Sequence, residues 1–98
     1  MDGLARLEAI EEIKQLKGRY FLHLDTRNWG EWRKVFADDA LRDVSGHSPD
    51  ADDPSVHNRH GVDAIVEMVS GSLAGIVTAH HGHTPIITID SDETASGV

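Results

Sequence analysis

The chain has 98 residues, of which 39% are hydrophobic and 27% charged, a composition typical of one small globular domain. Its formal net charge of −8 argues against nucleic acid or a membrane surface as a partner, because binding to phosphate groups requires a basic patch. The sequence contains no cysteine, which excludes disulfide scaffolds and thiolate sites, and no apolar run typical of a signal peptide or membrane span, so we expect a cytoplasmic protein.

Two helices are predicted in the first part of the chain. Residues 3–26 carry apolar side chains every three or four positions, which places them on one face of a long helix that Asp2 can cap. That apolar face comprises Leu4, Leu7, Ile10, Ile13, Leu16, Tyr20 and Leu24. A short second helix follows, for which Asn28 and Glu31 form a capping pair. Its apolar side chains are Trp29, Trp32, Val35 and Phe36.

A strand, a loop and a third helix are predicted next. Residues 40–45 are expected to begin a strand, and residues 46–61 predict a loop, because they hold Gly, Pro, Ser and Asp with almost nothing apolar. The third helix has apolar side chains at helical spacing, and Gly71 and Gly75 mark its end. Those apolar side chains are Val62, Ile65, Val66, Val69 and Leu73.

The last part of the chain is predicted to be β-rich from Ile76 onward, with a turn at residues 90–94. The order of elements predicts an α+β fold, in which helices pack on one face of an antiparallel sheet. Val98 lies within a predicted strand with no turn after it. We therefore expect residues 1–98 to form a single domain that is incomplete at its C-terminal end, or whose sheet a partner chain completes.

Three stretches of the chain resemble the SnoaL-like branch of the NTF2-like superfamily, whose members include scytalone dehydratase and bile-acid 7α-dehydratase. The stretches are "GRYFLHLDTRNWGEWRKVFADDA" at 18–40, "HGVDAIVEMVSGSL" at 60–73 and "TAHHGHTPIITIDSDETASGV" at 78–98. The resemblance implies a curved antiparallel sheet wrapped by three helices into a cone, with a ligand pocket at its wide end. It also implies a homodimer and no cofactor.

The resemblance also implies catalytic residues. In the dehydratase relatives, a tyrosine and an aspartate near the end of the first helix face a histidine that follows the third helix and opens a sheet strand. Tyr20 and Asp25 match the first two with the same five-residue offset, and His80 matches the histidine. His80 would act as general acid and base, Asp25 would be its orienting partner or a second proton carrier, and Tyr20 would donate a hydrogen bond to a substrate oxygen.

The function implied is that of a cofactor-independent lyase or isomerase, dehydratase-like, acting on a hydrophobic cyclic, polyketide- or steroid-like small molecule. His23 and Trp29 are candidate substrate-binding residues, although Trp29 also fits a core position at helical spacing. Plain structural roles stay open for Tyr20, Asp25 and His80. The alternative function is a non-catalytic binding module, or a dimerising accessory subunit like those of ring-hydroxylating dioxygenases.

Three histidines, His80, His81 and His83, fall within four positions. In a strand, alternation would place His81 and His83 together on the face opposite His80. A His-x-His pair is also a known metal-ligand spacing, so a rival hypothesis adds His57, His60 or an aspartate as a third ligand. We favour a site without metal, because the loop before the third helix is more simply explained as a solvated acidic connection, and it also lacks the glycine and glutamate of the common calcium loop.

Overall fold

The computed structural model describes residues 1–44 and 57–98, and within them it confirms the α+β fold class. The helices are α1 (Gly3–Asp25), α2 (Trp29–Arg33) and α3 (Val62–Ser72), and the strands are β1 (Leu41–Arg42), β2 (Arg59–His60), β3 (Ile87–Ile89) and β4 (Ala95–Gly97). In these residues the strands form two antiparallel pairs, β1 with β2 and β3 with β4.

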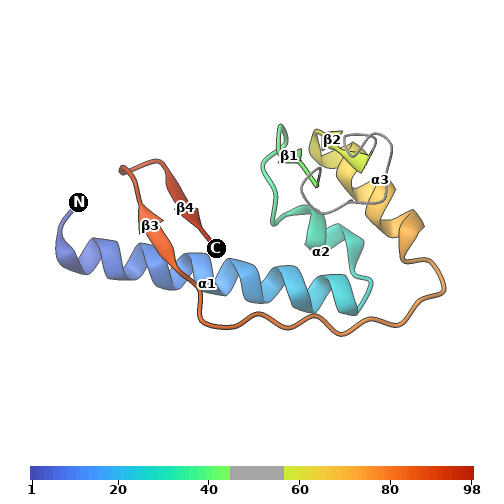
Figure 1. Ribbon diagram of the computed structural model, residues 1–98, viewed down its shortest axis with the longest axis horizontal. Coiled ribbons are helices and arrows are strands. Elements are labelled where there is room, and N and C mark those ends of the chain that lie inside the picture. Colours follow the sequence, from blue (N-terminus) through green and yellow to red (C-terminus); the bar gives the residue numbers. More distant parts are fainter. Residues whose placement is uncertain (45–56) are drawn as a thin grey trace.

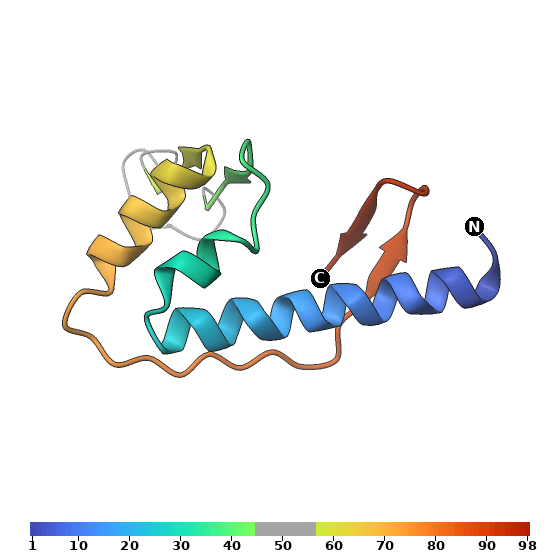
Figure 2. The same ribbon diagram turned by 180° about the vertical axis from the view of Figure 1, so that it is seen from behind.

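The long helix α1 is the element on which the others rest. α2, α3 and the first strand pair lie over its C-terminal half, and the β3–β4 hairpin lies over its N-terminal half (Figure 1). The chain after α3 runs back along α1 to reach the hairpin, as the view from behind also shows (Figure 2). Asp2 caps α1 as predicted, since its carboxylate accepts a hydrogen bond of 2.7 Å from the Ala5 backbone N–H.

The core lies where α1, α2 and α3 meet. Leu24, Trp32 and Ile65 come from one helix each and are almost fully buried. The ring of Phe36 meets Trp32 edge-on, with centroids 4.8 Å apart, and Tyr20 packs against both rings, 5.5 Å from Trp32 and 6.0 Å from Phe36. The aromatic spacing in the sequence therefore produces a packed core between the helices.

The prediction of a loop at 46–61 is wrong for Arg59 and His60. Arg59–His60 forms β2, which pairs with β1 through Leu41 and His60. These two residues carry no strand pattern of their own. They are held by the partner strand and by Gly61, whose backbone N–H donates to Ala40. The rest of the predicted loop, residues 45–56, lies outside the described residues.

The prediction of strand structure from Ile76 onward is also wrong, because the first strand in this part of the chain begins at Ile87. Residues 76–85 run along α1 without pairing to any strand of the described structure, and only Ile86 exchanges backbone hydrogen bonds with Val98 beside the hairpin, so His80 does not open a strand. A strand requires a partner backbone. Here side chains of α1 hold the segment instead, and Thr84 with φ 42° together with Pro85 interrupts an extended conformation.

One contact shows how closely this returning segment approaches α1. A Cβ atom built on Gly82 would lie 2.6 Å from the ring of Phe21, whereas one on Gly18 in the middle of α1 would meet nothing within 4 Å. Any side chain larger than glycine at position 82 would therefore require the Phe21 ring to move.

Gly82→Ala is expected to destabilise the protein by about 1–3 kcal/mol, because the added methyl group forces the Phe21 ring to move. The control, Gly18→Ala, adds the same methyl group in open space and is expected to stabilise α1 by about 0.5–1 kcal/mol. Urea unfolding of the two variants measures both changes. A Gly82→Ala protein as stable as the unmodified chain would contradict the packing of this segment on α1.

Candidate functional site

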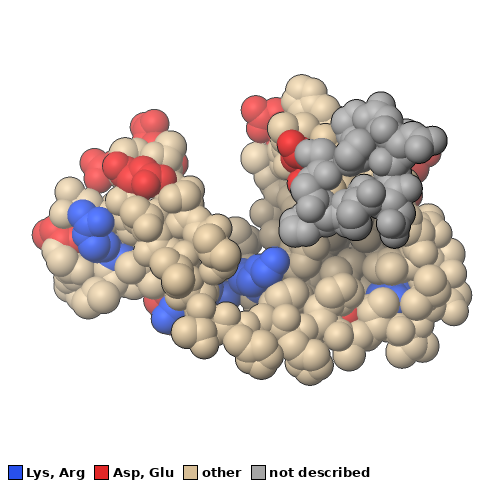
Figure 3. Space-filling model, in the orientation of Figure 1, with Lys and Arg blue, Asp and Glu red and all other residues tan. Residues whose placement is uncertain are grey.

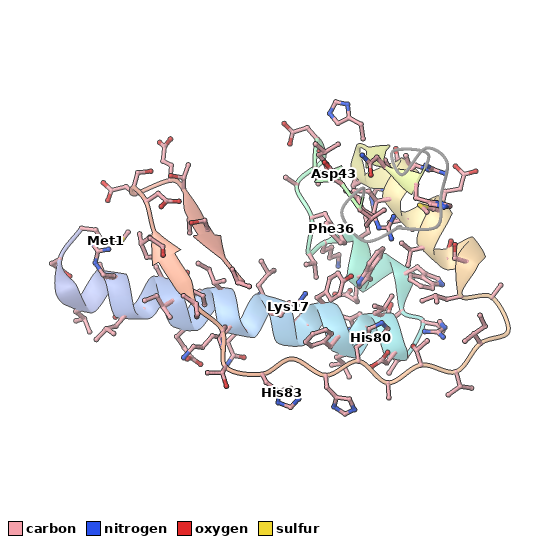
Figure 4. The ribbon with its side chains drawn as sticks, in the orientation of Figure 1. Met1, Lys17, Phe36, Asp43, His80 and His83 are labelled. Carbon is pink, nitrogen blue, oxygen red and sulfur yellow. The ribbon has the colours of Figure 1, made fainter. Side chains whose placement is uncertain are left out.

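The end of α1 and the returning segment meet at Asp25 and His80. The imidazole Nδ1 of His80 lies 2.6 Å from Oδ1 of Asp25, and the backbone N–H of His80 donates to Oδ2 at 2.8 Å. Asp25 is the last residue of α1, and Figure 4 shows His80 beside that end of the helix. One residue therefore engages both oxygens of the carboxylate.

A third hydrogen bond completes the surroundings of the carboxylate. The hydroxyl of Thr78 donates to Oδ1 of Asp25 at 2.7 Å. The pKa of Asp25 falls from 3.8 to about 2, chiefly because the backbone N–H of His80 donates to it, then through the His80 ring and the Thr78 hydroxyl. Asp25 is thus a stable anion at neutral pH.

The ionised carboxylate determines how His80 carries its proton. A carboxylate can only accept hydrogen bonds, so Nδ1 of the ring must be the donor in this contact. In the neutral imidazole, Nε2 is then left with a free lone pair that can take up a proton. The His80 side chain is 38% exposed, so a ligand can reach it.

An apolar groove of about 660 Å³ lies next to this pair, between α1 and the β3–β4 hairpin. Its lining includes Ile13, Lys17, Phe21, Pro85 and Ile87. His80 is not part of the lining, but its ring stacks on Phe21, with centroids 6.1 Å apart and planes 13° from parallel. Phe21 therefore links the groove to the Asp25–His80 pair.

The middle of α1 is exposed between the two halves of the molecule. The space-filling view shows a hollow there with basic side chains at its floor (Figure 3), and Lys17 lies in this region (Figure 4). The ammonium of Lys17 sits over the rings of Tyr20 and Phe21, 4.2 and 4.8 Å from their centroids. This part of the surface combines an apolar lining with a positive charge.

The structure does not bring Tyr20 into contact with the pair. Its ring meets Phe21 edge-on at 5.7 Å and otherwise packs against the core. No hydrogen bond joins it to Asp25 or His80 in residues 1–44 and 57–98. Burial raises the pKa of Tyr20, and Arg42 opposes this to a smaller extent, so the phenol keeps its proton at neutral pH.

Of the two candidate substrate-binding residues, Trp29 is the first residue of α2, and His23 lies on α1 close to α2. Trp29 meets Trp32 edge-on at 5.5 Å and packs against the core, which matches the alternative of a core position. His23 is half-buried and close to Glu31, whose pKa is lowered mainly by Lys34 and to a lesser extent by His23. Both roles in substrate binding stay predictions.

The other two histidines of the segment pair with each other. The rings of His81 and His83 stack with centroids 6.4 Å apart, as expected from alternation along an extended chain. For the rival metal site, no group of three His, Asp or Glu side chains suited to an ion is found in the described part of the chain.

Two residues that contribute to the site were not predicted. Thr78 lies two positions before His80, so alternation along an extended segment could have placed its hydroxyl on the same side. Arg27, which donates to that hydroxyl at 2.9 Å, follows α1 in a turn and carried no signal in the sequence.

A family model described as a SnoaL-like domain matches residues 5–98, which is nearly the whole chain. Among the helices described, none has the length and apolar character needed to cross a membrane.

The pKa of Asp25 can be tested by an NMR titration of its carboxyl carbon. We expect a value of about 2 rather than 3.8, and a higher one in Thr78→Val, which loses a hydrogen bond to the charged form. Because folding lowers this pKa, the stability that the carboxylate contributes is full above 3.8 and is lost as the pH falls through about 2.

Thr88→Val is the matched control for this titration, since Thr88 is an exposed residue of β3. It should leave the pKa of Asp25 unchanged. An Asp25 that titrates near 3.8 in the unmodified protein would show that the three hydrogen bonds are not formed in solution.

Proposed function

The chain belongs to the SnoaL-like family, and from this membership we propose that it is a cofactor-independent lyase or isomerase of the dehydratase type. The substrate proposed is a hydrophobic cyclic small molecule, polyketide- or steroid-like. The observation that carries the proposal is the hydrogen bond from His80 to the ionised Asp25, which leaves Nε2 of His80 free to accept a proton.

The proposed reaction begins with removal of a carbon-bound proton next to a carbonyl group. Nε2 of His80 takes the proton, and the carboxylate of Asp25 stabilises the imidazolium that forms. In a lyase the imidazolium then gives this proton to the departing hydroxyl, which leaves as water. In an isomerase it returns the proton to another carbon. Such acid–base help is worth about 10²–10⁴-fold in rate.

Tyr20 has the chemistry to assist this step. Its phenol carries its proton at neutral pH, and burial raises its pKa further, so it can donate a hydrogen bond to the carbonyl oxygen as negative charge develops there. Only the ring of Phe21 separates Tyr20 from His80 in the chain of aromatic contacts. We propose that a substrate lying along Phe21 reaches both groups.

The groove supports a small apolar substrate. Its volume of about 660 Å³ is in the range of sites for small molecules, and most of its lining is apolar. The Phe21 ring, which lines the groove and stacks on His80, offers a flat surface for a ring system.

The alternative is the non-catalytic accessory module, which would act through its surface. Ile76, Val77 and Ile86 of the returning segment are exposed, Val77 almost completely, and a second copy of the chain could cover them. The homodimer and the cytoplasmic location stay predictions.

Proton exchange with 1-tetralone, a bicyclic ketone, tests the proposed function. In D₂O the unmodified protein is expected to accelerate deuterium uptake next to the carbonyl, as followed by NMR. His80→Gln should lower this rate by about 10²–10⁴-fold, because no other side chain takes the proton. Asp25→Asn should also lower it, since the amide can no longer stabilise the imidazolium.

The control is His81→Gln, which changes a neighbouring imidazole that has its ring stacked on His83. It should keep the full exchange rate. A protein that binds 1-tetralone but exchanges no proton would favour the accessory module over the enzyme.

A further inference from the structure

The turn that ends α1 places an arginine where the backbone favours glycine. Arg27 has a φ of 59°, in the left-handed region. Its N–H donates to Leu24 and the N–H of Asn28 donates to His23, at 3.2 and 2.8 Å, which is the hydrogen-bond pattern of a Schellman motif. Glycine is the usual residue at this position, because any Cβ there is sterically unfavourable.

The side chain of Arg27 offers a reason for this choice. Its guanidinium donates to the carbonyl of Leu24 at 2.7 Å, to the carbonyl of Ile76, and to the hydroxyl of Thr78 at 2.9 Å. The rigid planar group thereby ties the end of α1 to the start of the returning segment. Glycine would make the turn without making any of these three contacts.

The contact with Thr78 leads on to the candidate site. A hydroxyl has one hydrogen to donate. The Thr78 hydroxyl donates a hydrogen bond to Oδ1 of Asp25, and its own oxygen accepts a hydrogen bond from Arg27. The donation from Arg27 occupies one of the two lone pairs of the Thr78 hydroxyl, which favours the orientation in which the hydroxyl hydrogen points toward the carboxylate. Arg27, Thr78, Asp25 and His80 therefore form one continuous series of hydrogen bonds.

We propose that Arg27 is a positioning residue, which acts through Thr78 to hold the Asp25 carboxylate against Nδ1 of His80 and so keeps Nε2 free as the base. The catalytic meaning of this role rests on the proposed function, whereas its effect on the tautomer of His80 does not. A conformationally unfavourable residue beside a candidate active site is the arrangement expected when the side chain serves that site.

The test is the tautomer of His80, read from the ¹⁵N chemical shifts of its ring nitrogens. The unmodified protein should hold mainly the Nδ1–H form. Arg27→Gly removes the guanidinium and suits the turn, so the protein should stay folded. The ratio of the Nδ1–H to the Nε2–H form should nevertheless fall by roughly two- to tenfold, the effect of one weakened hydrogen bond.

Variants of Thr78 show whether Arg27 acts through this hydroxyl. Thr78→Val should shift the tautomer ratio in the same direction, Thr78→Ser should restore it, and adding Arg27→Gly to Thr78→Val should change it little further. Arg33→Gly is the matched control: Arg33 pairs with Asp63 on α3 and should not affect His80. Fully additive effects of Arg27 and Thr78 would overturn the proposed route.

A second measurement separates this proposal from the proposed function. If the exchange with 1-tetralone occurs, Arg27→Gly should lower kcat and leave KM unchanged, because Arg27 acts through Thr78 and not on the substrate. If the unmodified protein catalyses no exchange but the tautomer shifts as expected, the proposed function fails and the positioning role stands. A folded Arg27→Gly protein with an unchanged tautomer ratio would overturn the positioning role itself.

Discussion

The carboxylate of Asp25 is the point at which the chain that returns from α3 is fastened to the first helix. Three donors from Thr78 and His80 meet its two oxygens, and this concentration of hydrogen bonds keeps the group ionised. The returning segment has no strand partner in the described structure, so this anchor replaces the backbone ladder that would otherwise fix its position. The same contacts that hold the segment also set the orientation and protonation of His80.

The helix that carries Asp25 also joins the two halves of the molecule. Over its C-terminal half, α2 and α3 bury Leu24, Trp32 and Ile65, and over its N-terminal half the β3–β4 hairpin lies against it (Figure 1). Phe21 lies between these regions, and its ring touches both the groove and His80. The candidate site is therefore built where a rigid core ends and an open surface begins, as is common for ligand sites.

The sequence predicts those parts of the structure that depend on local periodicity, and the helices follow from it closely. The strand β2 and the path of residues 76–86 depend instead on segments that are distant in the sequence and close in space. A local sequence pattern does not identify those segments. The closeness of Asp25 to His80 was accessible only through the family resemblance, since 55 positions separate the two residues. The sequence did not predict the role of Arg27, because the left-handed residue in a turn of this kind is usually glycine.

The unpaired path of the returning segment gives its backbone amides very different environments. The N–H of His80 donates to Oδ2 of the Asp25 carboxylate, whereas the described structure gives the amides of Val77, Ala79 and His81 no acceptor. Exchange with solvent deuterium should consequently be slow at one position and fast on both sides of it. The exchange rate of the His80 amide therefore reports whether His80 is hydrogen-bonded to the Asp25 carboxylate, in any solution and without a ligand.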